Sequence, residues 1–267
     1  MAKSKSDPAS KDAWNPHQYE KFKSERSQPF FDLMDLLLPT DAPKAIDLGC
    51  GPGELTAKLH EQTKASQTLG IDQSEEMLTK AKSFQTTNLV FRKGSIEEWQ
   101  AMHEYDIVFS NAAVQWCKHH PQLLAHFKDA LKPGGQLAIQ MPMNHDYPTH
   151  TLAIQMSTEE PWNKLLKGER YSQDESMLTM QQYAEQIFKL GFSEQKIFTR
   201  VYAHILPSRD SVIEWVSGTL LTYFKSRLSD ADYQSFLKTY KERLFKILPD
   251  DKPFFYPFKR VFIWARV

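Results

Sequence analysis

The stretch that decides the fold reads Ala45-Ile46-Asp47-Leu48-Gly49-Cys50-Gly51-Pro52-Gly53. Residues 45–48 form a short, mostly apolar segment that leads directly into a loop containing three glycines, and Leu55 to Gln62 is expected to be helical. Because glycine lacks a Cβ, it permits positive φ angles and lets the backbone approach a ligand closely. A strand, a glycine loop and a helix in this order predict a ligand-binding turn of an α/β sheet.

The spacing and charge of this loop narrow the class of ligand. A phosphate-binding loop needs a Lys-Ser/Thr pair after its last glycine, but Gly53 is followed by Glu54 and Leu55. The dinucleotide pattern G-x-G-x-x-G also fails, because its sixth position counted from Gly49 is Glu54. Asp47 and Glu54 would repel a pyrophosphate. They suit a ligand that carries an amine and a sulfonium, which is S-adenosylmethionine.

An acidic residue further along supports a nucleoside ligand. Asp72 ends the second expected strand, roughly 20 residues after the glycine loop, which is the position of an acidic residue that binds a ribose diol. A carboxylate there can accept hydrogen bonds from both hydroxyls. Taken alone, Asp72 is equally well interpreted as an ordinary loop or capping aspartate.

Short apolar segments alternate with amphipathic ones along the rest of the chain. Strands are expected near residues 45–48, 68–71, 89–91, 106–109, 137–139, 194–202 and 260–265, and helices near 55–62, 122–131, 177–190 and 208–248. Pro133-Gly134-Gly135 and Gly191 are expected to end two of the helices. The alternation predicts an α/β fold: a doubly wound, Rossmann-like, mostly parallel seven-stranded sheet with a helical cap.

The same pattern predicts how the chain is divided. The expected parts are a disordered tail (1–13), an N-terminal helical cover (14–43), the ligand-binding core (44–142), a loop-rich insertion (143–175), a core helix and strand (176–207), a helical cap (208–250) and the last core strand (251–267).

Composition excludes several classes of protein. The 267 residues include 33 basic and 33 acidic side chains, so there is no basic surplus of the kind that nucleic-acid binding needs. No apolar run approaches the ~20 residues that span a membrane, and the N-terminus lacks the apolar core of a signal peptide. Only Cys50 and Cys117 are cysteines, which favours a reducing compartment and predicts a cytoplasmic protein.

Several motifs resemble those of a known family. The glycine loop, Gly70-Ile71-Asp72 and Leu131-Lys132-Pro133-Gly134-Gly135 are similar to the signature stretches of class I methyltransferases. From residue 14 to the C-terminus, further motifs resemble trans-aconitate methyltransferases; they are Trp14-Asn15-Pro16, Tyr19, Glu25-Arg26-Ser27, Ser110-Asn111-Ala112, Gln115-Trp116, Gln140-Met141-Pro142 and Arg260-Val261-Phe262. This resemblance implies methyl transfer to a carboxylate of a small acid.

The resemblance also assigns roles. The residues expected to bind S-adenosylmethionine are Asp47, Gly49, Gly51, Gly53, Asp72, Gln73, Ser95, Ile96, Ser110, Asn111 and Ala112. Asp47, Gly49 and Gly51 would hold its methionine end, Asp72 the ribose and Gln73 the adenine side. Ser95 replaces the acidic residue usual in the family. Trp116, Tyr19 and Arg26 are the expected catalytic residues, Trp116 as a wall beside the sulfonium and the other two within an N-terminal cover.

The acceptor is less well defined. Carboxylates are ionised at neutral pH, so methylating one requires no general base. Candidate anion-binding residues are Arg26, Lys225, Arg227, Lys259 and Arg260, although each could equally be a solvated surface charge. The family carries an arginine where this chain has Tyr223, which weakens the case for a tricarboxylate. Two alternatives stay open: an acid carried on acyl carrier protein, as in biotin synthesis, and a binding module without catalysis.

The remaining chemistry-bearing residues give weaker predictions. His119 and His120 are adjacent and lack accompanying ligands, so a surface or hinge pair is expected and no metal site is predicted. His145 and His150 are possible donors to the acceptor, from an expected loop. Cys50 is expected to pack within the glycine loop, since no histidine is near it in sequence to activate it.

Overall fold

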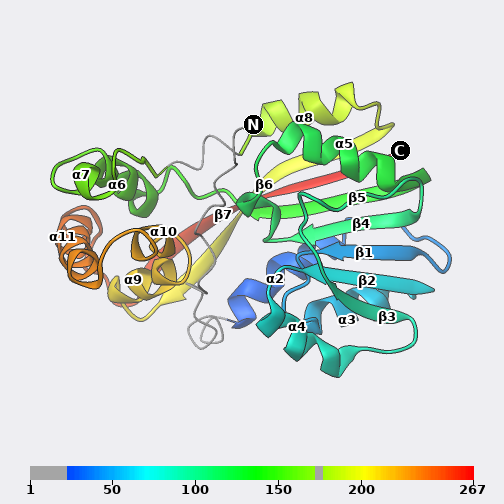
Figure 1. The fold of residues 1–267 in the computed structure, drawn as a ribbon, viewed down its shortest axis with the longest axis horizontal. Helices are drawn as coiled ribbons and strands as arrows, with labels where there is room; N and C mark the ends of the chain where they lie inside the picture. Colours follow the sequence, from blue (N-terminus) through cyan, green and yellow to red (C-terminus); the bar gives the residue numbers. More distant parts are fainter. Residues whose placement is uncertain (1–22, 172–176) are drawn as a thin grey trace, which may run out of the picture. The chain divides into compact units, whose positions relative to one another are not determined.

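The computed structural model describes residues 23–171 and 177–267. In its first half the elements are α2 (Lys23–Met34), β1 (Lys44–Leu48), α3 (Glu54–Gln62), β2 (Gln67–Asp72), α4 (Glu75–Ala81), η1 (Lys82–Phe84), β3 (Leu89–Lys93), β4 (Tyr105–Asn111), η2 (Val114–Trp116), α5 (His120–Ala130) and β5 (Leu131–Pro142). The second half contains α6 (Pro148–Ser157), α7 (Trp162–Leu165), α8 (Met180–Lys189), β6 (Glu194–Leu206), α9 (Asp210–Ser217), α10 (Thr222–Lys225), α11 (Asp230–Ile247) and β7 (Phe254–Arg266). Figure 1 shows these elements.

The strands form a seven-stranded sheet in the order β3-β2-β1-β4-β5-β7-β6. Strands β1 to β5 pair in parallel, and β7 runs antiparallel to β5. The chain therefore has the doubly wound, Rossmann-like α/β fold that the sequence predicts. The strand order reverses between β1 and β4, and at such a switch point the carboxyl ends of the strands form the ligand-binding edge.

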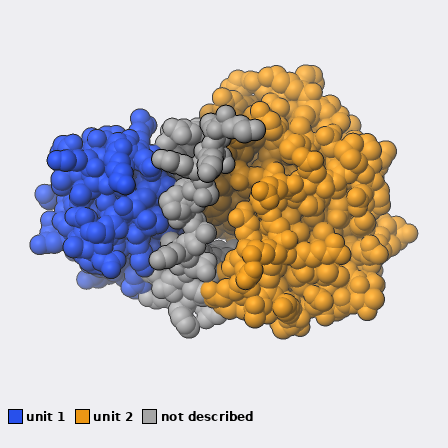
Figure 2. Space-filling model, in the orientation of Figure 1, with its two compact units in different colours: residues 1–25, 144–172, 203–258 blue, residues 26–143, 173–202, 259–267 orange. Residues whose placement is uncertain are grey.

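The chain divides into two compact units, coloured separately in Figure 2. The sheet unit consists of the described parts of residues 26–143, 173–202 and 259–267. The helical unit consists of the described parts of residues 1–25, 144–172 and 203–258, and it includes α6, α7, α9, α10 and α11.

The sheet unit buries both faces of its sheet. On one face, α5 and α8 pack Phe127 and Ile187 against strand residues that include Val108 and Ile139. On the other face, α2 and α3 cover a second cluster, whose members are Phe30, Leu33, Met34, Ala45, Leu59, Ala65, Ile107, Phe109, Ala138, Tyr202, Phe262 and Trp264. This two-sided burial explains why the strands read as apolar runs without alternation.

A buried glutamine ties the segment after α2 to the sheet. Gln136 on β5 accepts a hydrogen bond from Leu38 N (2.7 Å) and donates one to Leu38 O (2.9 Å). Its Oε1 also accepts a bond from the indole Nε1 of Trp264 (3.0 Å). These bonds satisfy polar groups that would otherwise be buried without partners.

The helical unit has its own core, built largely from aromatic side chains. Phe224 and Phe236 stack with ring centroids 4.2 Å apart, and Trp162 meets Phe236 edge-on at 5.3 Å. Ser229 caps α11 by accepting a hydrogen bond from Asp232 N (3.2 Å), as expected for a capping serine.

One prediction about this region is wrong. Residues 143–175 were expected to be rich in loops, but Pro148 to Ser157 form α6 and Trp162 to Leu165 form α7. Pro148 lies in the first turn of α6, where a proline is tolerated because its missing N–H has no partner there in any helix. Leu152, Ala153 and Met156 then face the core of the helical unit.

Several predicted boundaries also shift. Strand β6 continues to Leu206 and β7 begins at Phe254, so both strands are longer than the sequence pattern indicated. The expected disordered tail, residues 1–13, lies outside the described residues, as does the first part of the expected cover. The described part of that cover, residues 23–43, consists of helix α2 and the segment that leads from it to β1.

We predict that Trp264→Ala destabilises the protein by about 3–5 kcal/mol, because it removes a large side chain that is 1% exposed and leaves a cavity. Urea unfolding followed by circular dichroism measures this change. The control is Phe188→Ala on α8, where the side chain is 74% exposed and a change within about 0.5 kcal/mol is expected. Equal effects of the two substitutions would contradict the packing described here.

Candidate functional site

The glycine loop forms a tight turn that is fastened to the neighbouring strand. Gly49, Gly51 and Gly53 all have positive φ angles, of 85°, 53° and 81°. The backbone N–H groups of Gly49 and Cys50 both donate to the carbonyl of Ile71 on β2, at 2.8 and 3.0 Å. The loop is therefore held at the carboxyl edge of β1 and β2.

Close packing explains why two of these positions need glycine. A Cβ on Gly49 would lie 2.2 Å from the Cβ of Ala113, and one on Gly53 would lie 2.7 Å from the Cβ of Ala81. By contrast, no atom of the described residues lies within 4 Å of a Cβ built on Gly51. Gly51 therefore faces open space, which leaves room for a ligand against the loop backbone.

Asp72 lies beside the loop, as predicted. Its Oδ2 accepts a hydrogen bond from Gly51 N and its Oδ1 accepts one from Ser74 N, both at 2.9 Å. An ionised carboxylate has about four acceptor positions, so two remain after these bonds. The carboxylate is thus oriented by the backbone and still able to accept bonds from two hydroxyls.

Asp47 is the buried acid of the site. Its side chain is 3% exposed, and its Oδ2 accepts a hydrogen bond from the hydroxyl of Thr56 on α3 (2.6 Å). Burial raises the pKa of Asp47 to about 7, because desolvation disfavours the charged form; the Thr56 bond opposes this rise and the charge of Asp72 adds to it. A cationic ligand nearby would favour ionised Asp47.

Gln73, Ser95 and Ile96 come together at the ends of β2 and β3. The amide of Gln73 donates to the hydroxyl of Ser95 (3.4 Å), which also accepts a bond from Glu97 N (3.2 Å). Ile96 is buried, and its Cδ1 would lie 3.4 Å from a Cβ on Gly49. A polar pair and an apolar side chain therefore border the loop.

The end of β4 and the residue that follows it complete this edge of the sheet. The buried hydroxyl of Ser110 donates to Leu48 O (2.7 Å), and Ala112, whose φ is 54°, donates through its N–H to Gln140 O (2.8 Å). Among the described residues, the buried Oδ1 of Asn111 has no hydrogen-bond partner. Strand β4 thus ends in a buried amide oxygen that can accept a hydrogen bond from a ligand.

Trp116 is the one predicted catalytic residue whose side chain the structure describes. It ends η2 and is 60% exposed, so it is not a core tryptophan. The preceding Gln115 is buried, and its amide donates to Ala112 O (2.7 Å). Tyr19 and the side chain of Arg26 lie outside the described residues, so their predicted roles stay predictions.

The basic candidates lie in different surroundings. Arg227 pairs with Glu169 (2.9 Å) and lies over the Tyr223 ring at 3.9 Å, contacts that belong to the helical unit. Lys225 is exposed and Lys259 is half-buried. Arg260 is only 4% exposed and lies on β7 of the sheet unit. Arg260 contacts Gln140, for which the sequence predicted no role. The sequence feature that could have drawn attention to Gln140 is the family-like motif Gln140-Met141-Pro142.

The expectation of a surface or hinge pair at His119 and His120 is half wrong. His119 is exposed in a left-handed conformation, but His120 is buried at 1%. Its Nδ1 lies 2.6 Å from the hydroxyl of Tyr183, and its Nε2 lies 3.1 Å from Val114 O. Burial lowers the pKa of His120. His120 thus links η2 to α8, a long-range role that adjacent histidines in a sequence do not reveal.

Two further predictions concern residues without a direct role. Cys50 packs in the loop, where burial raises the pKa of its thiol, and burial raises that of Cys117 to about 12. Neither is an activated nucleophile. His150 is also buried, and desolvation lowers its pKa to about 4. It lies in α6 and not in the expected loop. A buried imidazole that is neutral at pH 7 carries no charge to attract an anion, so His150 is a poor candidate for binding the acceptor.

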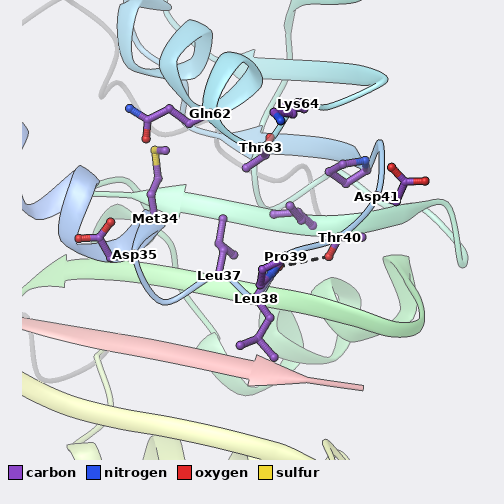
Figure 3. A pocket seen from close by; sticks show the side chains of 12 residues that line it. Met34, Asp35, Leu37, Leu38, Pro39, Thr40, Asp41, Gln62, Thr63 and Lys64 are labelled. Atoms are coloured by element: carbon purple, nitrogen blue, oxygen red, sulfur yellow. Dashed lines mark hydrogen bonds between the residues drawn. The ribbon is translucent and has the colours of Figure 1, made fainter.

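A separate pocket lies at the opposite edge of the sheet. It has a volume of about 570 Å³ and lies between the end of α2, the segment before β1 and the end of α3 (Figure 3). Asp35, Asp41 and Lys64 among its lining residues are all exposed. Because parallel sheets bind ligands at the carboxyl ends of their strands, we assign the functional site to the glycine-loop edge.

Comparison with known proteins identifies the family. A family model described as a methyltransferase domain matches residues 39–203. Trans-aconitate 2-methyltransferase of Deinococcus radiodurans is 39% identical over 256 residues, covering 94% of this chain and 97% of that protein. The enzyme of the same name from Streptomyces avermitilis is 34% identical, covering 97% and 98%. The chain belongs to the trans-aconitate 2-methyltransferase family.

Solved structures of low sequence identity share the fold of this protein. YcgJ of Bacillus subtilis matches with a TM-score of 0.61 at 14% identity, covering 90% of this chain and 97% of that one. Phosphoethanolamine N-methyltransferase 2 of Haemonchus contortus, solved with S-adenosyl-L-methionine, matches with a TM-score of 0.53 at 19% identity, covering 90% and 52%.

The family member is an S-adenosylmethionine-dependent methyltransferase, as the sequence predicted. The residues present fit this cofactor, since the loop offers open space at Gly51 and acidic side chains at Asp47 and Asp72. Within the described ranges, no cluster of three potential ligands could hold a metal ion. No described helix is both long and apolar enough to cross a membrane.

We predict that Gly49→Ala abolishes measurable cofactor binding, because its Cβ would overlap that of Ala113 and force the loop away from the turn after β4. Isothermal titration with S-adenosylmethionine measures the affinity. Gly191→Ala is the control: Gly191 also has positive φ, 78°, but a Cβ there meets no atom of the described residues within 4 Å. Normal binding by the Gly49 variant would show that the close approach is dispensable.

We also predict a pH dependence that originates from Asp47. Ionised Asp47 attracts a cationic cofactor, so affinity should rise as pH increases through about 7, and the rise should be smaller in Asp47→Asn. In the unfolded chain the pKa of Asp47 is about 3.9, so the folded state binds the proton more tightly. Asp47 therefore contributes most to folding stability below pH about 3.9. This contribution is lost as pH rises through about 7.

Titrations at several pH values, together with urea unfolding, check both parts of this prediction. Comparison with Asp47→Asn removes the cofactor's own titration from the result. If the two proteins showed parallel affinity profiles, Asp47 would not titrate beside the cofactor.

Proposed function

We propose that the protein transfers the methyl group of S-adenosylmethionine to a carboxylate oxygen of a small acid that resembles trans-aconitate. The observation that carries this proposal is the full-length similarity to enzymes named trans-aconitate 2-methyltransferase, together with an acidic glycine-loop site. An acceptor carried on acyl carrier protein is not favoured, because these relatives are named for a free acid.

Bound S-adenosylmethionine would supply a methyl group on a positively charged sulfur; the acceptor oxygen forms a bond to that carbon while the C–S electron pair returns to sulfur. No proton moves in this exchange, because the acceptor carboxylate is already ionised. The protein therefore needs no general base, and its contribution is to bind, align and desolvate the two reactants.

Each side chain has a proposed task in this alignment. Asp47 and the loop glycines 49, 51 and 53 hold the methionine end, and Asp72 accepts the ribose hydroxyls. Gln73, Ser95 and Ile96 border the adenine. Ser110, Asn111 and Ala112 form the floor near the sulfonium, and exposed Trp116 provides an aromatic face beside it. Tyr19 and Arg26 are proposed to cover the acceptor. The two free cysteines support a reducing location, and we propose the cytoplasm.

The test is methyl transfer from radiolabelled S-adenosylmethionine to a panel of small acids that includes trans-aconitate. We expect a methyl ester of one acid together with S-adenosylhomocysteine. Asp72→Ala should weaken cofactor affinity by about 1–3 kcal/mol, the typical effect of losing charged hydrogen bonds. Cofactor binding without turnover on any free acid would refute the proposed acceptor class.

A further inference from the structure

Arg260 lies at the carboxyl edge of the sheet in an unusual environment for a cation. It pairs with Pro142 across β5 and β7 and is 4% exposed. Its Nη1 lies 3.5 Å from Oε1 of Gln140, and its guanidinium lies 6.0 Å from the centre of the Tyr202 ring. Arginine is rarely buried to this extent, so its position beside Gln140 calls for a specific role.

Gln140 connects this arginine to the floor of the cofactor site. It is fully buried, and its register partner on β4 is Asn111. Its backbone carbonyl accepts the N–H of Ala112 (2.8 Å) while its side-chain oxygen faces Arg260. Register partners point to the same face of a sheet, and so do residues two apart in one strand. Asn111 pairs with Gln140, and Arg260 pairs with Pro142, two residues after Gln140. Asn111, Gln140 and Arg260 therefore lie on one face of β4, β5 and β7, and we call them the row.

The row presents donors that suit an anion. Nε2 of Gln140 has no hydrogen-bond partner in the described parts of the chain although it is fully buried. A buried amide N–H without a partner is unfavourable, so a group that accepts a hydrogen bond from it would be bound favourably. The adjacent guanidinium favours a carboxylate as that group, since arginine binds carboxylates through paired hydrogen bonds.

Tyr202 is held in place beside Arg260 by a separate set of bonds. Its hydroxyl donates to Oδ2 of Asp32 on α2, and the same oxygen pairs with Arg200 at 2.8 Å. The ring is therefore fixed on the face of the sheet that α2 covers. This arrangement limits the positions open to the guanidinium, which lowers the entropic cost of binding an anion.

We propose that Arg260 and Gln140 bind a carboxylate of the acceptor that is not itself methylated. This inference rests on the proposed function. Neighbouring strands lie about 5 Å apart, so an anion held at β5 is about one small molecule's length from the turn 110–112. The acceptor must then carry at least two carboxylates: one held by Arg260 and Gln140, and another that reaches the methyl group.

The test compares Arg260→Met, Gln140→Glu and the control Arg266→Met in the full chain. Arg266 lies on the same strand, but it is more exposed and bonds to Glu194 and Gly134. Gln140→Glu keeps the side-chain shape and gives Arg260 an anionic partner within the protein. It should therefore fold while blocking the acceptor carboxylate.

Steady-state turnover gives KM for trans-aconitate, and titration gives Kd for S-adenosylmethionine. We expect KM to rise about 10- to 100-fold in both site variants, the effect of losing a charged hydrogen bond. Cofactor Kd should stay within about threefold of the wild-type value. Arg266→Met should match the wild type in both constants, and single-carboxylate acids should be poor substrates for every version.

Equilibrium titration of trans-aconitate into protein saturated with S-adenosylhomocysteine separates the two proposals. Acid binding that depends on Arg260, without turnover, would refute the proposed reaction and keep the carboxylate site. Normal KM in both site variants would overturn the site while the proposed function stands. Absence of any acid binding, or cofactor Kd rising in parallel with KM, would also overturn it.

Discussion

The rest of the site depends on the close approach between the glycine loop and the turn after β4. Gly49 lies so near Ala113 that a Cβ added to Gly49 would be only 2.2 Å from the Cβ of Ala113 and would overlap it. This contact places the cofactor loop of β1 directly against the segment that follows β4. The two bonds to Ile71 O then fix the same loop to β2. Three strand ends are thereby held in one geometry by backbone packing.

This geometry also sets the electrostatics. Because the loop encloses Asp47, water cannot solvate the carboxylate and its pKa rises to about 7. Asp72, by contrast, accepts hydrogen bonds from two backbone N–H groups, those of Gly51 and Ser74. The backbone therefore orients Asp72, whereas the pKa of Asp47 lies close to neutral pH. A cationic ligand would compensate the burial of Asp47.

Local pattern was sufficient to predict the sheet and the cofactor loop, because both are encoded within short stretches. Residues 45–53 carry a strand, three glycines and the start of a helix, and each apolar run elsewhere became a strand of the predicted type. Helices α6 and α7 were missed because prolines in this region suggested loops. Pro148, however, lies in the first turn of α6, and Pro161 directly precedes α7. His120 was misjudged because its partner, Tyr183, is far away in sequence.

The row Asn111, Gln140 and Arg260 could not be predicted for the same reason, since its members come from three strands. A neutral glutamine beside a buried arginine becomes informative only when strand register places them together. The arrangement follows from the chemistry of the reaction. A carboxylate acceptor needs no base, so selectivity must come from where charge is placed. In the proposed arrangement, Asp47 and Asp72 favour a cationic cofactor on one side of the turn, and Arg260 favours an anionic acceptor on the other.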